Sequence, residues 1–187
     1  MLGVGRRSMK TSKDRRRLFF ALWPSDELRD QIVSATRVIA RDSGGRVIPA
    51  ENLHVTLLFL GQVATSRLQS VQQAGDACAR FSPFELSFDR TESWGRANLL
   101  CLTTSSVPAA ATQLEHELRR ALDGALGDAS THEFRPHITL ARDLPRRRPA
   151  EPVAPLRMNV NDFVLVDSRP GPSGSLYTVI ARWPLLS

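Results

Sequence analysis

Hydrophobic and polar positions fall into short blocks along this chain, and each block predicts one strand or one helix. The apolar run from Leu18 to Leu22 predicts a buried strand, which ends at Trp23-Pro24. Ser25 then provides a helix N-cap, and Gly44 marks the point where that helix should stop. The apolar positions between them recur every three or four residues, as on one face of a helix. They are Leu28, Ile32, Ala35 and Ile39.

The rest of the chain continues in the same manner. Further strands are predicted at 53–60, 84–88, 98–102, 136–142, 162–167 and 177–183, and further helices at 66–80 and 109–126. Gly61 should close the strand that contains His54. Four prolines between Pro145 and Pro155 predict a loop.

The order of these elements contains a repeat. A strand around Phe20, a helix and a strand with His54 are followed later by a strand around Cys101, a helix and a strand with His137. The spacing from the first strand to the histidine is 34 residues in one copy and 36 in the other. An internal duplication of this kind predicts two halves related by a pseudo-twofold axis, with His54 and His137 across a shared cleft.

The duplicated strands carry the same four-residue pattern, His-x-Thr-Leu. Since side chains alternate between the two faces of a strand, His54 and Thr56 should share one face while Val55 and Leu57 enter the core. His137 and Thr139 repeat this arrangement. One His-x-Thr is most simply the polar edge of a half-buried strand, but two copies at matching places of a repeat indicate a site.

Two imidazoles and two hydroxyls that converge from opposite sides suit a tetrahedral anion such as phosphate. Histidine can act as acid or base near neutral pH, so the pair could open a cyclic phosphodiester without a metal or cofactor. The residues do not tell which histidine is the acid. Arg142, five residues after His137, could hold the phosphate, or could be a surface arginine at a strand end. A zinc site would need three or four ligands, and threonine is a poor one.

The net charge of +6 lies at the N-terminal end of the chain. Residues 1–17 hold seven basic and one acidic side chain, which leaves 18–187 neutral. This distribution predicts a disordered basic arm over 1–16, with a transit peptide as the alternative, and it argues against a broad phosphate-binding surface. No apolar run approaches the roughly 20 residues of a membrane span. Cys78 and Cys101 lie in apolar stretches, as expected of buried thiols in a reducing cytoplasm.

These motifs resemble those of the two-histidine phosphoesterases, specifically the RNA 2′,3′-cyclic phosphodiesterases, also called 2′-5′ RNA ligases. The resemblance covers nearly all of 17–187, a single domain. It is carried by residues 17–22, 52–57 with 59–61, and 134–142, and by Ser168, Gly174 and Tyr177 near the end.

The resemblance implies a bilobal α+β fold, with two antiparallel sheets and outer helices around a central cleft. It implies hydrolysis of RNA 2′,3′-cyclic phosphate ends to 2′-phosphomonoesters, with reversible 2′-5′ RNA ligation as a possible further reaction, in a cytoplasmic monomer. By analogy His54 is the proton donor and His137 the proton acceptor, and the phosphate is held by Thr56, Thr139 and Arg142.

Two other functions remain open from the sequence. The same cleft could serve a non-catalytic nucleotide-binding module, or the chain could bind RNA mainly through its basic arm. The intact pair of histidines favours the enzyme over both alternatives.

Overall fold

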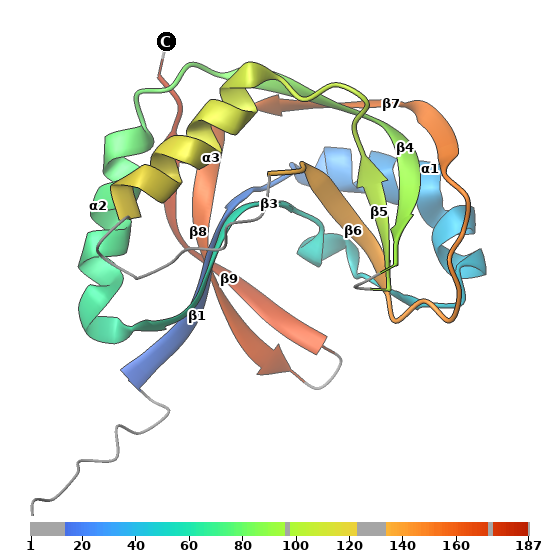
Figure 1. Cartoon of the computed structure of the whole chain (residues 1–187), viewed down its shortest axis with the longest axis horizontal. Helices are drawn as coiled ribbons and strands as arrows, with labels where there is room; N and C mark the ends of the chain where they lie inside the picture. Colours follow the sequence, from blue (N-terminus) through green and yellow to red (C-terminus); the bar gives the residue numbers. More distant parts are fainter. Residues whose placement is uncertain (1–13, 96–97, 123–133, 172–173, 187) are drawn as a thin grey trace, which may run out of the picture.

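The computed structural model describes residues 14–95, 98–122, 134–171 and 174–186, and Figure 1 shows their arrangement. The first strand–helix–strand unit consists of β1 (Arg15–Leu22), α1 (Asp26–Asp42) and β3 (Val55–Ala64), with the short β2 (Arg46–Val47) between the last two. The second consists of β5 (Leu99–Thr103), α3 (Ala109–Leu122) and β6 (His137–Arg142). The remaining elements are α2 (Leu68–Cys78), β4 (Phe84–Trp94), β7 (Glu151–Val160), β8 (Asp162–Gly171) and β9 (Gly174–Pro184). Turns of 3-10 helix occupy Ala50–Asn52 and Thr65–Arg67.

The strand order has the symmetry that the repeat predicts. Across the sheet it runs β7-β4-β5-β6-β3-β1-β8-β9, so each strand of one half has a counterpart at the same distance from the centre. All of the pairings are antiparallel. The two halves form two lobes, and the expected bilobal α+β architecture is confirmed.

The lobes join through the two histidine-bearing strands. β3 and β6 pair through Val55 and Ile138, which are the residues that follow the two histidines. The pseudo-twofold axis therefore passes between equivalent residues. This pairing places both His-x-Thr motifs at the middle of the molecule.

The helices lie on the outer side of the sheet, and each helix of the repeat packs on the other lobe (Figure 1). α1 contacts β6 and β7, while α3 contacts β3 and lies beside α2. The Ser25 hydroxyl caps α1 by accepting a hydrogen bond from the Leu28 amide, as predicted. The buried face of α1 differs from the prediction, because Thr36 and Ala40 are buried in place of Ala35 and Ile39.

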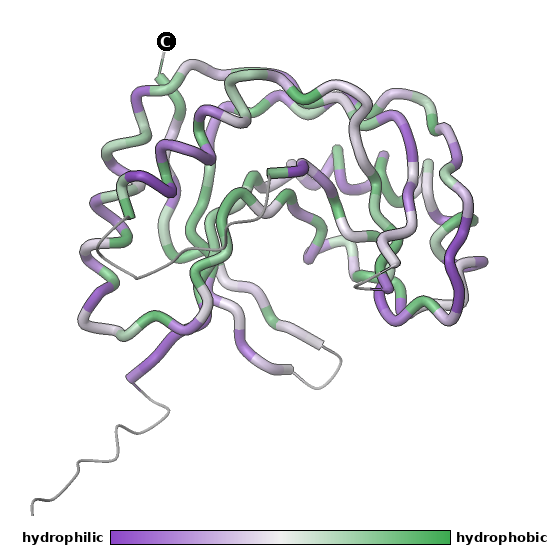
Figure 2. The backbone as a smooth tube through the Cα atoms, viewed as in Figure 1, coloured by the Kyte–Doolittle hydropathy of each residue, from purple (hydrophilic) through white to green (hydrophobic). Residues whose placement is uncertain are grey.

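The core has two parts because β1 is buried on both faces. Leu18, Phe20 and Leu22 enter the main core between sheet and helices. Phe19 and Ala21 point to the concave side, where they form a second cluster with Val164 and Val166. Figure 2 shows the resulting hydrophobic path through the central strands. This second cluster supports the side chains of the concave surface.

Several boundaries differ from the sequence prediction, and three of these differences have a clear physical reason. β1 begins at Arg15, one residue before the expected end of the arm, because Arg16 binds the buried carboxylate of Asp167. β3 continues through Gly61, whose φ of 67° accommodates a β-bulge. The predicted proline loop is wrong in its second half, since β7 starts at Glu151. Its prolines are tolerated because β7 is an edge strand, paired with β4 alone.

Residues 1–13 of the predicted arm and the predicted end of the third helix at 123–126 lie outside the described residues. In the described part of the chain, no helix has the length and apolar character needed to cross a membrane.

Candidate active site

His54 is held at the start of β3 by hydrogen bonds from both ring nitrogens. Its Nδ1 lies 2.7 Å from the carbonyl oxygen of Asn52, and because that oxygen can only accept, Nδ1 carries a proton. Its Nε2 lies 3.1 Å from the Thr56 hydroxyl, which then donates to the free lone pair. Sequence alternation predicted that His54 and Thr56 share a face, and the structure confirms it.

Aromatic rings surround His54 on several sides. The Phe19 and Tyr177 ring centroids lie 4.9 and 5.2 Å from that of His54, and the Trp23 ring stacks on it at 5.7 Å with an interplanar angle of 20°. The guanidinium of the buried Arg29 lies 5.1 Å from the Trp23 ring. These contacts fix the plane of the imidazole and keep water from most of its surface.

His137 is bound in the equivalent way on β6. Its Nδ1 lies 2.7 Å from the carbonyl oxygen of Arg135, two residues earlier, as Asn52 lies two residues before His54. The centroid of the Trp94 ring lies 4.3 Å from that of the His137 ring. The guanidinium carbon of Arg135 lies over the same Trp94 ring, 4.8 Å from its centroid. In both lobes, therefore, a backbone carbonyl fixes the tautomer and leaves Nε2 for chemistry.

Burial favours the neutral form of both histidines. Burial lowers the pKa of His54 to about 4, although the hydrogen bond to Asn52 opposes this. The positive charges of His137, Arg142 and Arg29 lower the same pKa further. Burial also lowers the pKa of His137, with Arg135 and Arg142 contributing. Positive charge around the histidines marks the site as one that would receive an anion.

The two motifs are diagonal neighbours across the lobe junction. The antiparallel pairing of Val55 with Ile138 sets His54 level with Thr139, and Thr56 level with His137. Diagonal neighbours of this kind lie about 7–8 Å apart in a regular sheet. That spacing would leave room for one tetrahedral group between the imidazoles.

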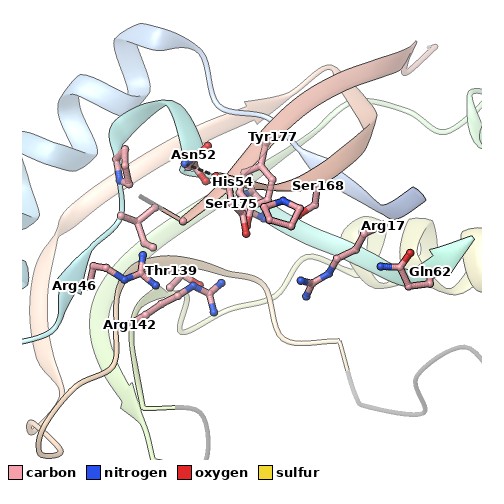
Figure 3. A pocket seen from close by; sticks show the side chains of 14 residues that line it. Arg17, Arg46, Asn52, His54, Gln62, Thr139, Arg142, Ser168, Ser175 and Tyr177 are labelled. Atoms are coloured by element: carbon pink, nitrogen blue, oxygen red, sulfur yellow. Dashed lines mark hydrogen bonds between the residues drawn. The ribbon is translucent and has the colours of Figure 1, made fainter. Parts of the chain in front are cut away.

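A cavity of about 480 Å³ opens beside His54 (Figure 3). Thr139 and Arg142 line it with His54, whereas Thr56 and His137 lie outside its lining. Three arginines from different strands point into this space, and they are Arg17, Arg46 and Arg142. Arg46 pairs in register with Arg142 and contacts Asp143 at 3.4 Å. Within the described chain, Arg17 and Arg142 have no carboxylate partner.

The cavity also contains residues that sequence reasoning did not assign to the site. Arg46 and Gln62 could not be assigned to the site from the sequence, because each is a single polar residue outside the repeated motifs. Arg17, Ser168 and Tyr177 are among the residues that carry the family resemblance, but the resemblance implied no role for them in the site. Cross-strand pairing places them here, because Arg17 lies opposite Ser168 and Ser168 lies opposite Tyr177.

The other histidines and the cysteines have no part in this arrangement. His116 is exposed on α3, and His132 lies outside the described residues. Cys78 and Cys101 are free and buried, and burial raises the pKa of Cys101 to about 12. Among the residues that the structure describes, no group of three or more His, Cys, Asp or Glu side chains is placed to hold a metal ion.

Comparison with known proteins places this site in a family. Residues 24–172 match the family described as the 2′-5′ RNA ligase superfamily. The chain is 31% identical to the RNA 2′,3′-cyclic phosphodiesterase of Escherichia coli strain K12, over 90% of this chain and 96% of that protein. It is equally similar, at 31%, to the protein of the same name from Thermus thermophilus, with 90% of both chains covered. The crystal structure of E. coli LigT complexed with 3′-AMP superposes with a TM-score of 0.85 at 31% identity, covering 92% of this chain and 99% of that one. The chain belongs to the 2′-5′ RNA ligase superfamily.

Proposed function

We propose that this protein is an RNA 2′,3′-cyclic phosphodiesterase that hydrolyses cyclic phosphate ends to 2′-phosphomonoesters without a metal ion. The observation that carries the proposal is the pair of His-x-Thr motifs that face one another diagonally beside an arginine-lined cavity. The names of the E. coli and T. thermophilus relatives support the reaction, and the complex of E. coli LigT with 3′-AMP supports a nucleotide ligand.

The phosphate would bind between the two histidines. Thr139 and the guanidinium of Arg142 would donate hydrogen bonds to its non-bridging oxygens from the cavity wall. Thr56 would hold the opposite side, after its hydroxyl is released from His54. Because Arg142 has no carboxylate partner among the described residues, its charge is available for the negative charge that develops on the phosphoryl oxygens.

The unequal surroundings of the histidines support the assignment of roles made by analogy. Among the described residues His137 contacts one aromatic ring and its Nε2 has no hydrogen-bond partner, so it can take a proton from water. His54, enclosed by three rings, would protonate the departing ribose 3′ oxygen. The bond from the water oxygen to phosphorus forms and the bond from phosphorus to the 3′ oxygen breaks, which leaves a 2′-phosphate and a 3′-hydroxyl.

His54 must take up a proton from the solvent when the substrate binds, since its pKa of about 4 leaves it neutral in the free enzyme at pH 7. A phosphate anion beside the ring offsets the nearby positive charges and favours the imidazolium. If a 5′-hydroxyl of a second RNA attacks in place of water, the same proton transfers give a 2′-5′ linkage.

Product analysis on a defined 2′,3′-cyclic oligonucleotide tests the proposal. We expect the 2′-phosphate alone, at the same rate with EDTA present. A 3′-phosphate product would contradict the geometry, and binding without turnover would favour a nucleotide-binding module.

We also propose that the protein acts as a cytoplasmic monomer. The free, buried thiols of Cys78 and Cys101 fit a reducing compartment. Light scattering after size exclusion should give the mass of one 20.7 kDa chain, and a dimer mass would contradict the proposal.

A further inference from the structure

A row of side chains continues across the concave face of the first lobe, beyond His54. Residues directly opposite one another on neighbouring strands share a face of the sheet. The row consists of Gln62 on β3, Arg17 on β1, Ser168 on β8 and Tyr177 on β9, each opposite the next. All four line the His54 cavity, and Figure 3 shows Arg17 and Gln62 at the end away from Arg142. The cavity is therefore longer than the phosphate site requires.

An exposed aromatic ring lies next to this row. Phe59 is opposite Phe19 in the β1–β3 register, so it shares the concave face with the ring that contacts His54. Phe59 is 42% exposed, whereas Phe19 is 3% exposed. Among the large hydrophobic side chains that are exposed in the described parts of the chain, Phe59 is the one aromatic residue. An exposed aromatic ring on a concave sheet surface is suited to contact a flat ring of a bound molecule.

Arg17 links this ring to the cavity. Its guanidinium carbon lies 5.0 Å from the centroid of Phe59. The neighbouring cations are engaged, since Arg16 binds Asp167 and Arg46 contacts Asp143, but Arg17 has no carboxylate partner in the described structure. An unpaired guanidinium beside an exposed aromatic ring is the combination that binds single-stranded nucleic acid, with the base on the ring and the phosphate on the cation.

The distance from the histidines fits one nucleotide. The Phe19 ring lies 4.9 Å from His54, and Arg17 lies two residues further along β1, which adds about 7 Å. A cyclic phosphate terminates the 3′ end of an RNA, so any further nucleotide must lie on its 5′ side. A nucleotide that lies along the row from His54 to Arg17 is therefore the one that precedes the cyclic end.

We propose that Arg17 and Phe59 form a second nucleotide subsite, which binds the residue 5′ of the cyclic-phosphate nucleotide. Phe59 stacks on its base, and Arg17 binds the phosphate that joins the two nucleotides. The subsite accepts any base, because stacking does not read hydrogen-bonding edges. This inference rests on the proposed function and deepens it, because it assigns a subsite to the nucleotide that precedes the cyclic end of the RNA.

The test compares two substrates within each enzyme variant. They are a 2′,3′-cyclic mononucleotide and a dinucleotide that ends in the same cyclic nucleotide. The quantity measured is the ratio of kcat/KM for the dinucleotide to that for the mononucleotide. Because both values come from one protein sample, partial misfolding of a variant cancels from the ratio.

The wild-type ratio should be about 5- to 150-fold, the range that one base stacked on an aromatic side chain provides. Phe59→Ala and Arg17→Gln should each bring the ratio close to one. Matched controls are Val38→Ala, an exposed apolar side chain on α1, and Arg157→Gln, an exposed arginine on β7, and both should keep the wild-type ratio. A wild-type ratio near one, or a ratio that survives both cleft substitutions, overturns the subsite.

A failure of the subsite can be distinguished from a failure of the proposed function. If the wild type hydrolyses neither substrate, the proposed reaction fails. The subsite is then tested by calorimetry with the 2′-phosphorylated dinucleotide and mononucleotide, whose dissociation constants should differ by the same ratio. Equal dissociation constants would overturn the subsite on their own.

Discussion

An anion bound between the two motifs should protonate His54, and this can be measured without catalysis. In the free protein the pKa of His54 is about 4, so about 1% of the ring is protonated at pH 6. Sulfate is a tetrahedral dianion that does not itself titrate near this pH. Placed beside His54, Thr139 and Arg142, it replaces the repulsion from Arg142 and His137 by an attraction. The pKa of His54 should therefore rise, and most of the ring should be protonated at pH 6.

Nuclear magnetic resonance of the imidazole nitrogens, with and without saturating sulfate, measures this change directly. A His54→Gln variant assigns the signal, and the exposed His116 is the internal control, whose titration should not respond to sulfate. Calorimetry in buffers of different ionisation enthalpy should show proton uptake on sulfate binding at pH 6. Sulfate binding without protonation of His54 would refute the proton-donor role. Protonation of His137 instead would reverse the two roles.

Further predictions concern the phosphate contacts, the stability and the metal. Arg142→Gln should lower kcat/KM by about 10²- to 10³-fold in steady-state kinetics. Arg142→Lys should not restore the activity, since an ammonium group lacks the forked donors of a guanidinium. Full activity of the lysine variant would refute the proposed contact of Arg142 with the phosphate. Because the pKa of His54 is lower in the folded chain than its ordinary value of 6.5, acid favours unfolding: stability that is present above pH 6.5 should fall by on the order of 2 kcal/mol as the pH drops to 4. Urea titrations at pH 7 and 4.5 should show a smaller loss for His54→Gln than for the wild type, and an equal loss would contradict the burial of a neutral ring. Dialysis against EDTA should leave turnover unchanged, and activity restored only by a divalent ion would require a metal.

The candidate pair of histidines could be predicted because the His-x-Thr-Leu motif occurs twice in the sequence. Alternation along a strand determines that His54 shares a face with Thr56, and the duplication determines that the second motif lies at the matching place of the other lobe. Both are properties of local order, and neither depends on long-range packing. The same is true of the helix cap at Ser25.

The rest of the site comes from contacts between distant segments. Arg17, Ser168 and Tyr177 meet only through the registers of β1, β8 and β9, which no local pattern specifies. The tryptophans beside the histidines show the same limit. Trp23 follows β1, whereas Trp94 ends β4, so the two occupy unrelated places in the repeat although both contact a histidine ring.

The strand β7 could not be predicted from the sequence for a different reason. Prolines normally mark loops, and here they lie on an edge strand, where the missing amide hydrogen removes no bond of the sheet interior. Whether a strand lies at an edge follows from the topology of the whole chain.

Single-turnover hydrolysis of a 2′,3′-cyclic dinucleotide by His54→Ala, His137→Ala and the double variant tests the central claim most directly. His116→Ala, which changes an exposed histidine on α3, is the control, and circular dichroism should show that each variant is folded. Each single substitution should cost about 10²- to 10⁴-fold in rate, and the double variant should be little slower than either, because the acid and the base act as one unit. Wild-type turnover in either single variant would contradict the account.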